Sequence, residues 1–210
     1  MKLDPLNFEI TEDALEELGS AYARYVATAS RVQDRFRCRH RIGVMGEDGS
    51  ADRAACWLRM VSIVEIYVEA LLKQLAGELP GRAPGGWSEV IGLLKRHHHV
   101  DVRDVAAWET LEACILVRNA VAHGLGRFTA KQFEKAAPRK VRAIGVPVRD
   151  GAVVITAASL LDCADICRAF IAGLDVHPRV IAQAQERLSQ VSEGSESWPT
   201  GGRGGSTRAM

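Results

Sequence analysis

The chain has 210 residues and carries 27 lysines and arginines against 26 aspartates and glutamates, a net charge of +1. Its hydrophobic fraction of 47% and charged fraction of 25% are ordinary for a globular protein and exclude wholesale disorder. The near-neutral charge also excludes a molecule that attracts nucleic acid over its whole surface, so any such contact must be local.

No run of apolar residues reaches the length of about 18 that a bilayer-spanning helix needs. Residues 1–9 lack the apolar core of a secretory signal. We therefore expect a cytoplasmic protein that does not contact a membrane.

The cysteines are odd in number and scattered, which does not suit a disulfide framework. Cys163 and Cys167 are four residues apart on an expected helix, but two thiols supply only half of a zinc site. We expect buried, inert thiols, no bound metal and no cofactor. The five cysteines are Cys38, Cys56, Cys114, Cys163 and Cys167.

The first predicted helix begins at Thr11, a good capping residue followed by acids, and runs to about residue 40. Glycines at positions 43, 46 and 49 then end it. The strongest helical pattern follows, because apolar residues recur there at three- and four-residue spacing. They are Trp57, Val61, Val64, Val68, Leu71, Leu72 and Leu75. This pattern predicts an amphipathic core helix.

Four more helices are predicted downstream by the same periodicity, at about 87–97, 105–124, 157–174 and 178–191. Between residues 140 and 155 the pattern changes to two β-branched runs around Arg149-Asp150-Gly151, which predicts two strands joined by an Asp-Gly turn. Residues 192–210 are too poor in apolar side chains to offset their ordering entropy. We expect an all-α helical bundle, one domain over 1–191 with a small inserted β-hairpin at about 140–155, and a disordered C-terminal tail at 192–210.

A local basic cluster lies late in the first predicted helix and is opposed only by Asp34. Its arginines are candidates for RNA binding. The alternative is a solvated helix end, where arginines favour the helix dipole. The candidate RNA-binding residues are Arg35, Arg37, Arg39 and Arg41, with Arg31 and His40 beside them.

The helix over 105–124 carries Arg118, Asn119 and His123 near its end. Asn119 and His123 are four residues apart and share a face, whereas Arg118 is about 140° round the helix from His123. A histidine can exchange protons near neutral pH, and a guanidinium can bind phosphate oxygens and stabilise charge that develops during phosphoryl transfer. The alternative is that these residues form an ordinary solvated helix end.

An arginine, a polar residue that is often asparagine, three variable residues and a histidine, late in a helix of a bundle, are the mark of the HEPN superfamily. Arg118-Asn119-Ala120-Val121-Ala122-His123 resembles that motif in full. Glu65, on the preceding core helix, is similar to the acid that many members place opposite the motif. The alternative for Glu65 is a solvated acid.

This resemblance, which covers about residues 52–174, implies a metal-independent endoribonuclease, such as a toxin or a defence effector. It implies a homodimer in which two motif helices form one RNA-binding cleft. The histidine would activate the ribose 2′-hydroxyl, the arginine would stabilise the phosphorane, and a cyclic phosphate would result. Arg118 and His123 would be catalytic, supported by Asn119 and more weakly by Glu65.

Two alternatives stay open. One is a non-catalytic module that binds RNA or a nucleotide, or that neutralises a toxin as a regulatory or antitoxin partner. The other is a purely structural helical interaction protein. The run His97-His98-His99 favours a helix end, because adjacent helical positions point about 100° apart and cannot converge on one ion.

Overall fold

The computed structural model describes residues 9–39, 49–76, 86–134 and 136–195, with side chains at 32–39 and 187–195 left out. Within these ranges the chain is an all-α bundle with a two-residue-per-strand hairpin, as the sequence predicts. Its elements are α1 (Glu9–Arg39), α2 (Ser50–Ala76), α3 (Trp87–His98), the 3-10 turn η1 (Val102–Asp104), α4 (Trp108–Gly124), α5 (Ala130–Glu134), α6 (Ala137–Ala143), β1 (Val148–Arg149), β2 (Ala152–Val153), α7 (Ala157–Asp175) and α8 (Pro178–Ser195).

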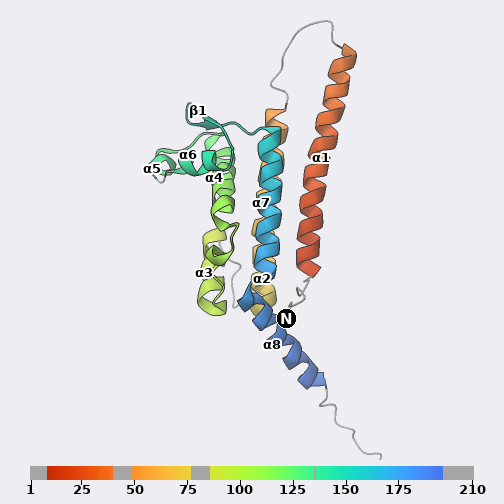
Figure 1. Ribbon diagram of the computed structural model, residues 1–210, viewed down its shortest axis with the longest axis vertical. Coiled ribbons are helices and arrows are strands. Elements are labelled where there is room, and N and C mark those ends of the chain that lie inside the picture. The colour runs from red at the N-terminus through yellow and green to blue at the C-terminus, as the bar shows by residue number, and fades with distance from the viewer. Residues whose placement is uncertain (1–8, 40–48, 77–85, 135, 196–210) are drawn as a thin grey trace, which may run out of the picture.

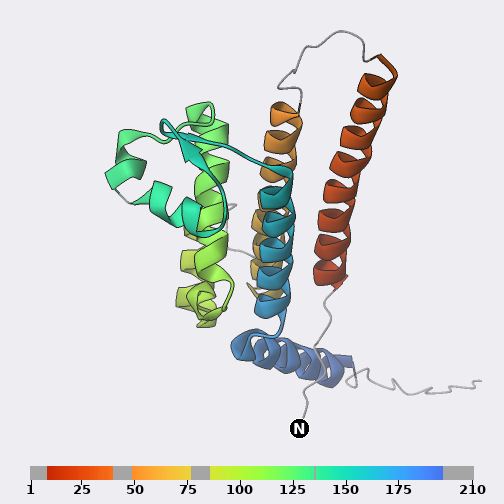
Figure 2. The ribbon, with the colours of Figure 1, turned by 45° about the horizontal axis from the view of Figure 1, so that its top comes forward.

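Helix α2 is the centre of the bundle and is contacted by α1, α3, α4 and α7. Figures 1 and 2 show α1, α2 and α7 side by side, with α3 and α4 on the opposite side from α1 and α8 crossing one end. The Trp57 ring is fully buried and its Nε1 donates a hydrogen bond to the Cys114 carbonyl at 3.0 Å, which joins α2 to α4. The predicted core helix is therefore confirmed.

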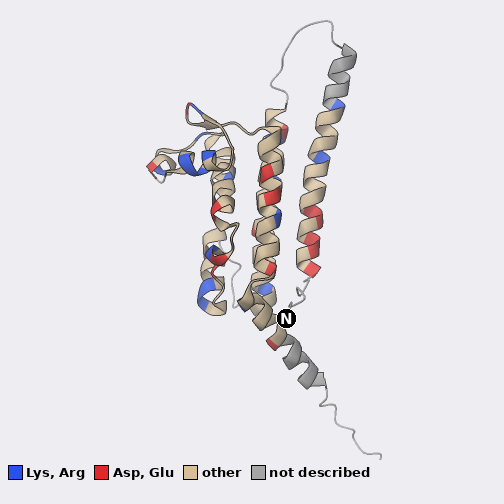
Figure 3. Cartoon of the chain, in the orientation of Figure 1, with Lys and Arg blue, Asp and Glu red and all other residues tan. Residues whose placement is uncertain are grey.

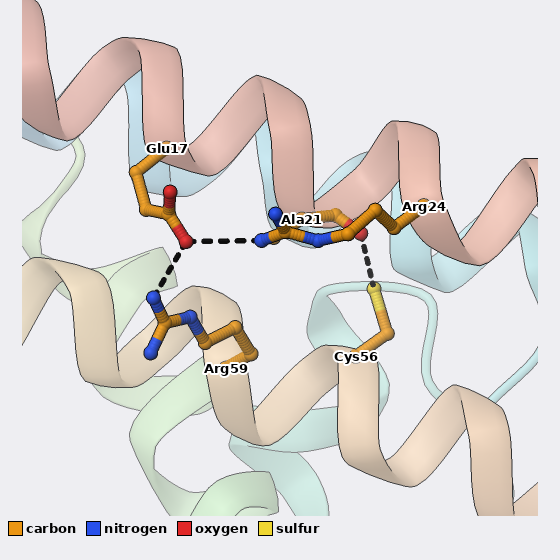
Figure 4. A network of polar contacts seen from close by, with 5 residues as sticks. All are labelled: Glu17, Ala21, Arg24, Cys56 and Arg59. Carbon is orange, nitrogen blue, oxygen red and sulfur yellow. Dashed lines mark hydrogen bonds and ion pairs between the residues drawn. The ribbon is translucent and has the colours of Figure 1, made fainter.

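Polar contacts hold α1 against α2 (Figure 4). The Glu17 carboxylate accepts hydrogen bonds from Arg24 on its own helix and from Arg59 on α2. These two guanidinium groups lower the pKa of Glu17. The Cys56 thiol donates to the Ala21 carbonyl at 3.9 Å. Because the Glu17 pairs are exposed, they contribute little to the stability of the fold.

The start of α1 differs from the predicted helix cap. The helix begins at Glu9, so Thr11 lies inside its first turn. Thr11 is buried and its hydroxyl donates to Asp175 Oδ1 at 2.8 Å. The prediction of Thr11 as a cap is wrong because this long-range hydrogen bond to α7 takes the place of a local capping contact.

The hairpin is shorter than predicted. Val148 pairs with Val153 and Arg149 with Ala152 around the expected Asp-Gly turn, but Val141 lies in α6. Ala137 and Val141 are four residues apart, so both are buried on one face of that short helix. Pro138 lies in the first turn of the helix, where proline is tolerated. The two short helices α5 and α6 were not predicted.

Two helix boundaries also differ from the prediction. Helix α4 begins at Trp108, because the segment before it forms η1 and Val105 caps that turn. Helix α8 continues through residues 192–195, which were expected to belong to the tail, and the remainder of the expected tail lies outside the described residues. None of the helices in the described ranges combines the length and apolar character needed to cross a membrane.

His177 joins α7 to α8 and is only 9% exposed. Its Nδ1 accepts a hydrogen bond from the Arg179 N–H at 3.3 Å, so the ring acts as a cap for α8, and its Nε2 lies 4.0 Å from Asp104 Oδ2. Burial lowers the pKa of His177, and the Asp104 carboxylate opposes this effect. Protonation would remove the acceptor at Nδ1.

We predict that His177 makes the fold sensitive to acid. Its pKa in the folded chain lies below the unfolded value of about 6.5, so the stability it contributes is present above that pH and lost as pH falls below it. His177→Asn keeps an acceptor in the place of Nδ1 but does not titrate. Chemical unfolding from about pH 7.5 to about pH 5.5 should show a smaller loss of unfolding free energy in this variant than in the wild type. The exposed His97→Asn variant should behave as the wild type, and identical pH profiles for all three proteins would contradict the prediction.

Candidate active site

The structure brings Arg118 and Glu65 together. Arg118 Nη2 on α4 donates to Glu65 Oε2 on α2 at 3.2 Å, and its Nη1 donates to Asn119 Oδ1 at 3.1 Å. The Arg118 and Glu65 side chains are 26% and 25% exposed, so the pair is half-buried. The acid expected to face the motif helix does contact it, and the contact fixes the guanidinium in one position.

Arg118 and Asn119 line a cleft of about 770 Å³ between α2, α3 and α4, which we call the Arg118 cleft. Its size lies within the usual range for ligand sites. The lining combines polar, aromatic and aliphatic side chains. They include Glu65, Ile66, Glu69, Trp87, Ile91, Arg103, Trp108, Glu112, Ile115, Leu116, Arg118 and Asn119.

An aromatic pair forms one wall of the Arg118 cleft. Trp87 from α3 and Trp108 from the start of α4 stack with their ring centroids 6.3 Å apart and an interplanar angle of 11°. Both rings also pack against Phe170 on α7, at 6.5 and 6.2 Å. The wall is thus held rigidly by the core while the outer parts of the indoles line the cleft.

The charges in the cleft are mixed. Glu65 is paired with Arg118, Glu69 with Lys73 at 2.9 Å, and Glu112 with Lys140. A guanidinium has five N–H donors, and Arg118 uses two of them in these contacts. Its remaining donors contact no other residue in the part of the chain that the structure describes, so they can bind an anionic group that enters the cleft. Arg103 adds a second guanidinium to the lining.

His123 lies apart from the cleft. It is exposed in the last turn of α4, and no hydrogen bond or ion pair joins it to another residue in the described parts of the chain. The helix ends directly after it, where Leu125 takes a left-handed conformation with φ 50° and, like Gly126, donates its N–H to the Ala120 carbonyl. The structure therefore brings together Arg118, Asn119 and Glu65, but not His123.

Sequence reasoning missed Trp87, Glu69 and Glu112 as members of the site. Glu69 follows Glu65 by one helical turn and so shares its face, a signal that was available. No local signal marks Trp87, because its contact with Trp108 depends on how α3 docks against α4.

The remaining candidate residues are the arginines of the basic cluster and the run of three histidines. The side chains of Arg35, Arg37 and Arg39 on α1 are not among those the structure describes, and Arg41 lies outside the described residues. His97 and His98 end α3 and His99 is its cap, as expected for a helix end, with His98 Nδ1 lying 2.8 Å from Gln183 Oε1.

The thiols of Cys56, Cys114, Cys163 and Cys167 are buried as expected. Burial and the neighbouring Cys114 and Cys167 thiols raise the pKa of Cys163, which keeps it protonated and unreactive. Within the described ranges, no group of three or more candidate ligands is arranged to hold a metal ion.

Comparisons with models of protein families, with curated proteins and with solved structures found no match to this chain.

The Arg118–Glu65 pair should contribute measurably to stability because its two side chains are only 26% and 25% exposed. A double-mutant cycle with Glu65→Gln and Arg118→Gln, measured by urea unfolding, is expected to give a coupling of about 1 kcal/mol. The exposed Arg168–Asp165 pair on α7 is the matched control and should couple by less than about 0.5 kcal/mol. Equal coupling in the two pairs would show that the half-buried position adds nothing.

Proposed function

We propose that the protein is a metal-independent endoribonuclease of the HEPN type that cleaves RNA with Arg118 and His123. The observation that carries this proposal is the position of the Arg118 side chain, which Glu65 and Asn119 hold in a cleft. Arg118 lies on α4, the helix that also bears the exposed His123. A fixed guanidinium with spare donors suits the stabilisation of a phosphorane, because it needs no reorganisation as charge develops.

In this mechanism the neutral His123 imidazole takes the proton of a ribose 2′-hydroxyl. The 2′-oxygen then attacks the adjacent phosphorus, and the bond to the 5′-oxygen of the next nucleotide breaks. The products are a 2′,3′-cyclic phosphate and a 5′-hydroxyl end. The leaving 5′-oxygen takes its proton from water, and the His123 imidazolium returns a proton to the solvent after the step. Arg118 holds the non-bridging phosphate oxygens throughout.

The geometry of α4 favours a homodimer for this chemistry. Arg118 and His123 are about 140° apart round the helix and about 7.5 Å apart along its axis, so they face different directions in one subunit. A second copy whose α4 lies across the Arg118 cleft would bring His123 of the partner subunit to the phosphate that Arg118 holds. A composite site of this kind uses both residues.

A second candidate is a binding module that holds RNA or a nucleotide without cutting it. The stacked Trp87 and Trp108 rings favour it, since they give the cleft an aromatic wall, and Glu65 already neutralises Arg118. In this case His123 has no role in function.

The nuclease assay separates these two functions. Purified wild type incubated with mixed cellular RNA in EDTA should release fragments that end in cyclic phosphate. His123→Ala and Arg118→Ala should lower the rate at least about 100-fold, the usual scale for loss of acid–base or oxyanion assistance, with unchanged circular dichroism. The melting temperature should stay unchanged in His123→Ala and fall slightly in Arg118→Ala, because Glu65 then loses its partner. The exposed His97→Ala variant on α3 is the matched control and should cleave as the wild type. Undiminished cleavage by His123→Ala would refute the mechanism, and RNA binding without cleavage by the wild type would favour the second candidate.

Mixing the two inactive variants tests the composite site. If each active centre takes Arg118 from one subunit and His123 from the other, a mixed dimer of Arg118→Ala and His123→Ala contains one centre with both residues intact. Activity should then return to a substantial fraction of the wild-type rate after the subunits exchange. If both residues act within one subunit, every centre in the mixture is damaged and activity stays absent.

A further inference from the structure

A strongly basic surface surrounds the end of α4 that carries His123. It belongs to residues 127–153, which include α5, α6 and the hairpin, and we call it the basic lobe. The described part of this lobe has six exposed lysines and arginines against two acids, although the whole chain has a net charge of only +1. Figure 3 shows the basic residues gathered on α6 and the neighbouring segments. The basic residues are Arg127, Lys131, Arg139, Lys140, Arg142 and Arg149, and the acids are Glu134 and Asp150.

Several of these cations are available to a ligand. Lys140 is paired with Glu112 on α4, and the Arg127 guanidinium donates to the Asp150 carbonyl. Arg139, Arg142 and Arg149 form no hydrogen bond or ion pair through their side chains with any residue that the structure describes. Arg139 and Arg142 are three residues apart on α6 and therefore project from the same side of the helix.

An exposed aromatic ring lies within the basic lobe. Phe133 is 49% exposed and meets Phe128 edge-on, with ring centroids 6.0 Å apart. Its ring lies against the hairpin turn, because a Cβ atom placed on Gly151 would come within 3.2 Å of Phe133 Cζ. The ring therefore lies next to the hairpin that carries Arg149. Cationic side chains together with an exposed aromatic ring are what single-stranded nucleic acids bind through phosphates and stacked bases.

The fold attaches this surface to the candidate active site. Ala137 and Val141 of α6 are buried, α6 packs against α4, and the Val153 N–H donates to the Gly126 carbonyl at 2.8 Å. Gly126 follows His123 by only three residues. A strand of RNA held on the lobe would therefore run beside the end of α4.

We propose that the basic lobe binds single-stranded RNA, with phosphates on Arg139, Arg142 and Arg149 and a base stacked on Phe133. The exposed aromatic ring favours RNA over an acidic protein partner, which would use the charges but not the ring. The delivery of this RNA to His123 rests on the proposed nuclease function, whereas binding by the lobe does not.

The test measures binding separately from cleavage. Fluorescence anisotropy with a 2′-O-methyl oligouridine of about 20 nucleotides, which lacks the attacking hydroxyl, gives the dissociation constant between about 50 and about 200 mM salt. The double variant Arg139→Gln/Arg142→Gln should bind more weakly and reduce the slope of log K against log salt by about 1.4, since each lost phosphate contact on a single strand contributes about 0.7. Phe133→Leu should weaken binding at least about fivefold and leave the salt slope unchanged.

The matched control is Arg96→Gln/Arg179→Gln, which removes the same charge from exposed positions on α3 and α8. It should leave the slope at the wild-type value. Equal changes in the two double variants, or none in the lobe variant, would overturn the proposal. Displacement of the oligonucleotide by polyglutamate at equal charge would overturn it in favour of an acidic protein partner. If the lobe variants behave as expected while the wild type fails to cut natural RNA, the nuclease function fails and the RNA-binding lobe stands.

Discussion

The burial of α2 is the constraint on which the rest of the structure depends. Eleven of its side chains are buried, so α1, α4 and α7 must pack around it. A helix covered in this way can keep a carboxylate near its covered side only where a partner compensates the charge. Arg118 is that partner for Glu65. The same packing that makes the core therefore also places a charged pair at the edge of the Arg118 cleft.

Long periodic helices were predictable from the sequence because one strong signal, apolar spacing, agrees with their packing. The limits of α3 and α7 follow from it almost to the residue. The segment from 127 to 147 was not predictable in this way. Val141 and Ile144 fit both a strand pattern and a helical turn, and burial against α4 decides for the helix. Thr11 shows the same limit, since its buried hydrogen bond to Asp175 spans most of the chain.

The candidate site was predictable in part for the same reason. Helical geometry alone separates Arg118 from His123, and the structure keeps them apart. The contact of Glu65 with the helix that bears Arg118 was expected only from the family resemblance of the motif, because the apolar pattern of α2 also allows a solvated acid at that position. The aromatic wall was not predictable, because Trp87 and Trp108 come from two helices whose docking no local pattern encodes. Functional residues that share one helix can thus be predicted from the sequence, whereas a cleft formed between three helices cannot.

The basic lobe leaves and rejoins the bundle at nearly the same point. The hydrogen bond from Val153 to Gly126 joins the two ends of the excursion between α4 and α7. Closing a loop whose ends already meet adds little entropic cost when its length changes, so insertions and substitutions on the outer side of this excursion leave the bundle frame undisturbed. Such an arrangement allows the outer surface of the basic lobe to change in sequence while α4, the helix that bears Arg118 and His123, keeps its place in the bundle.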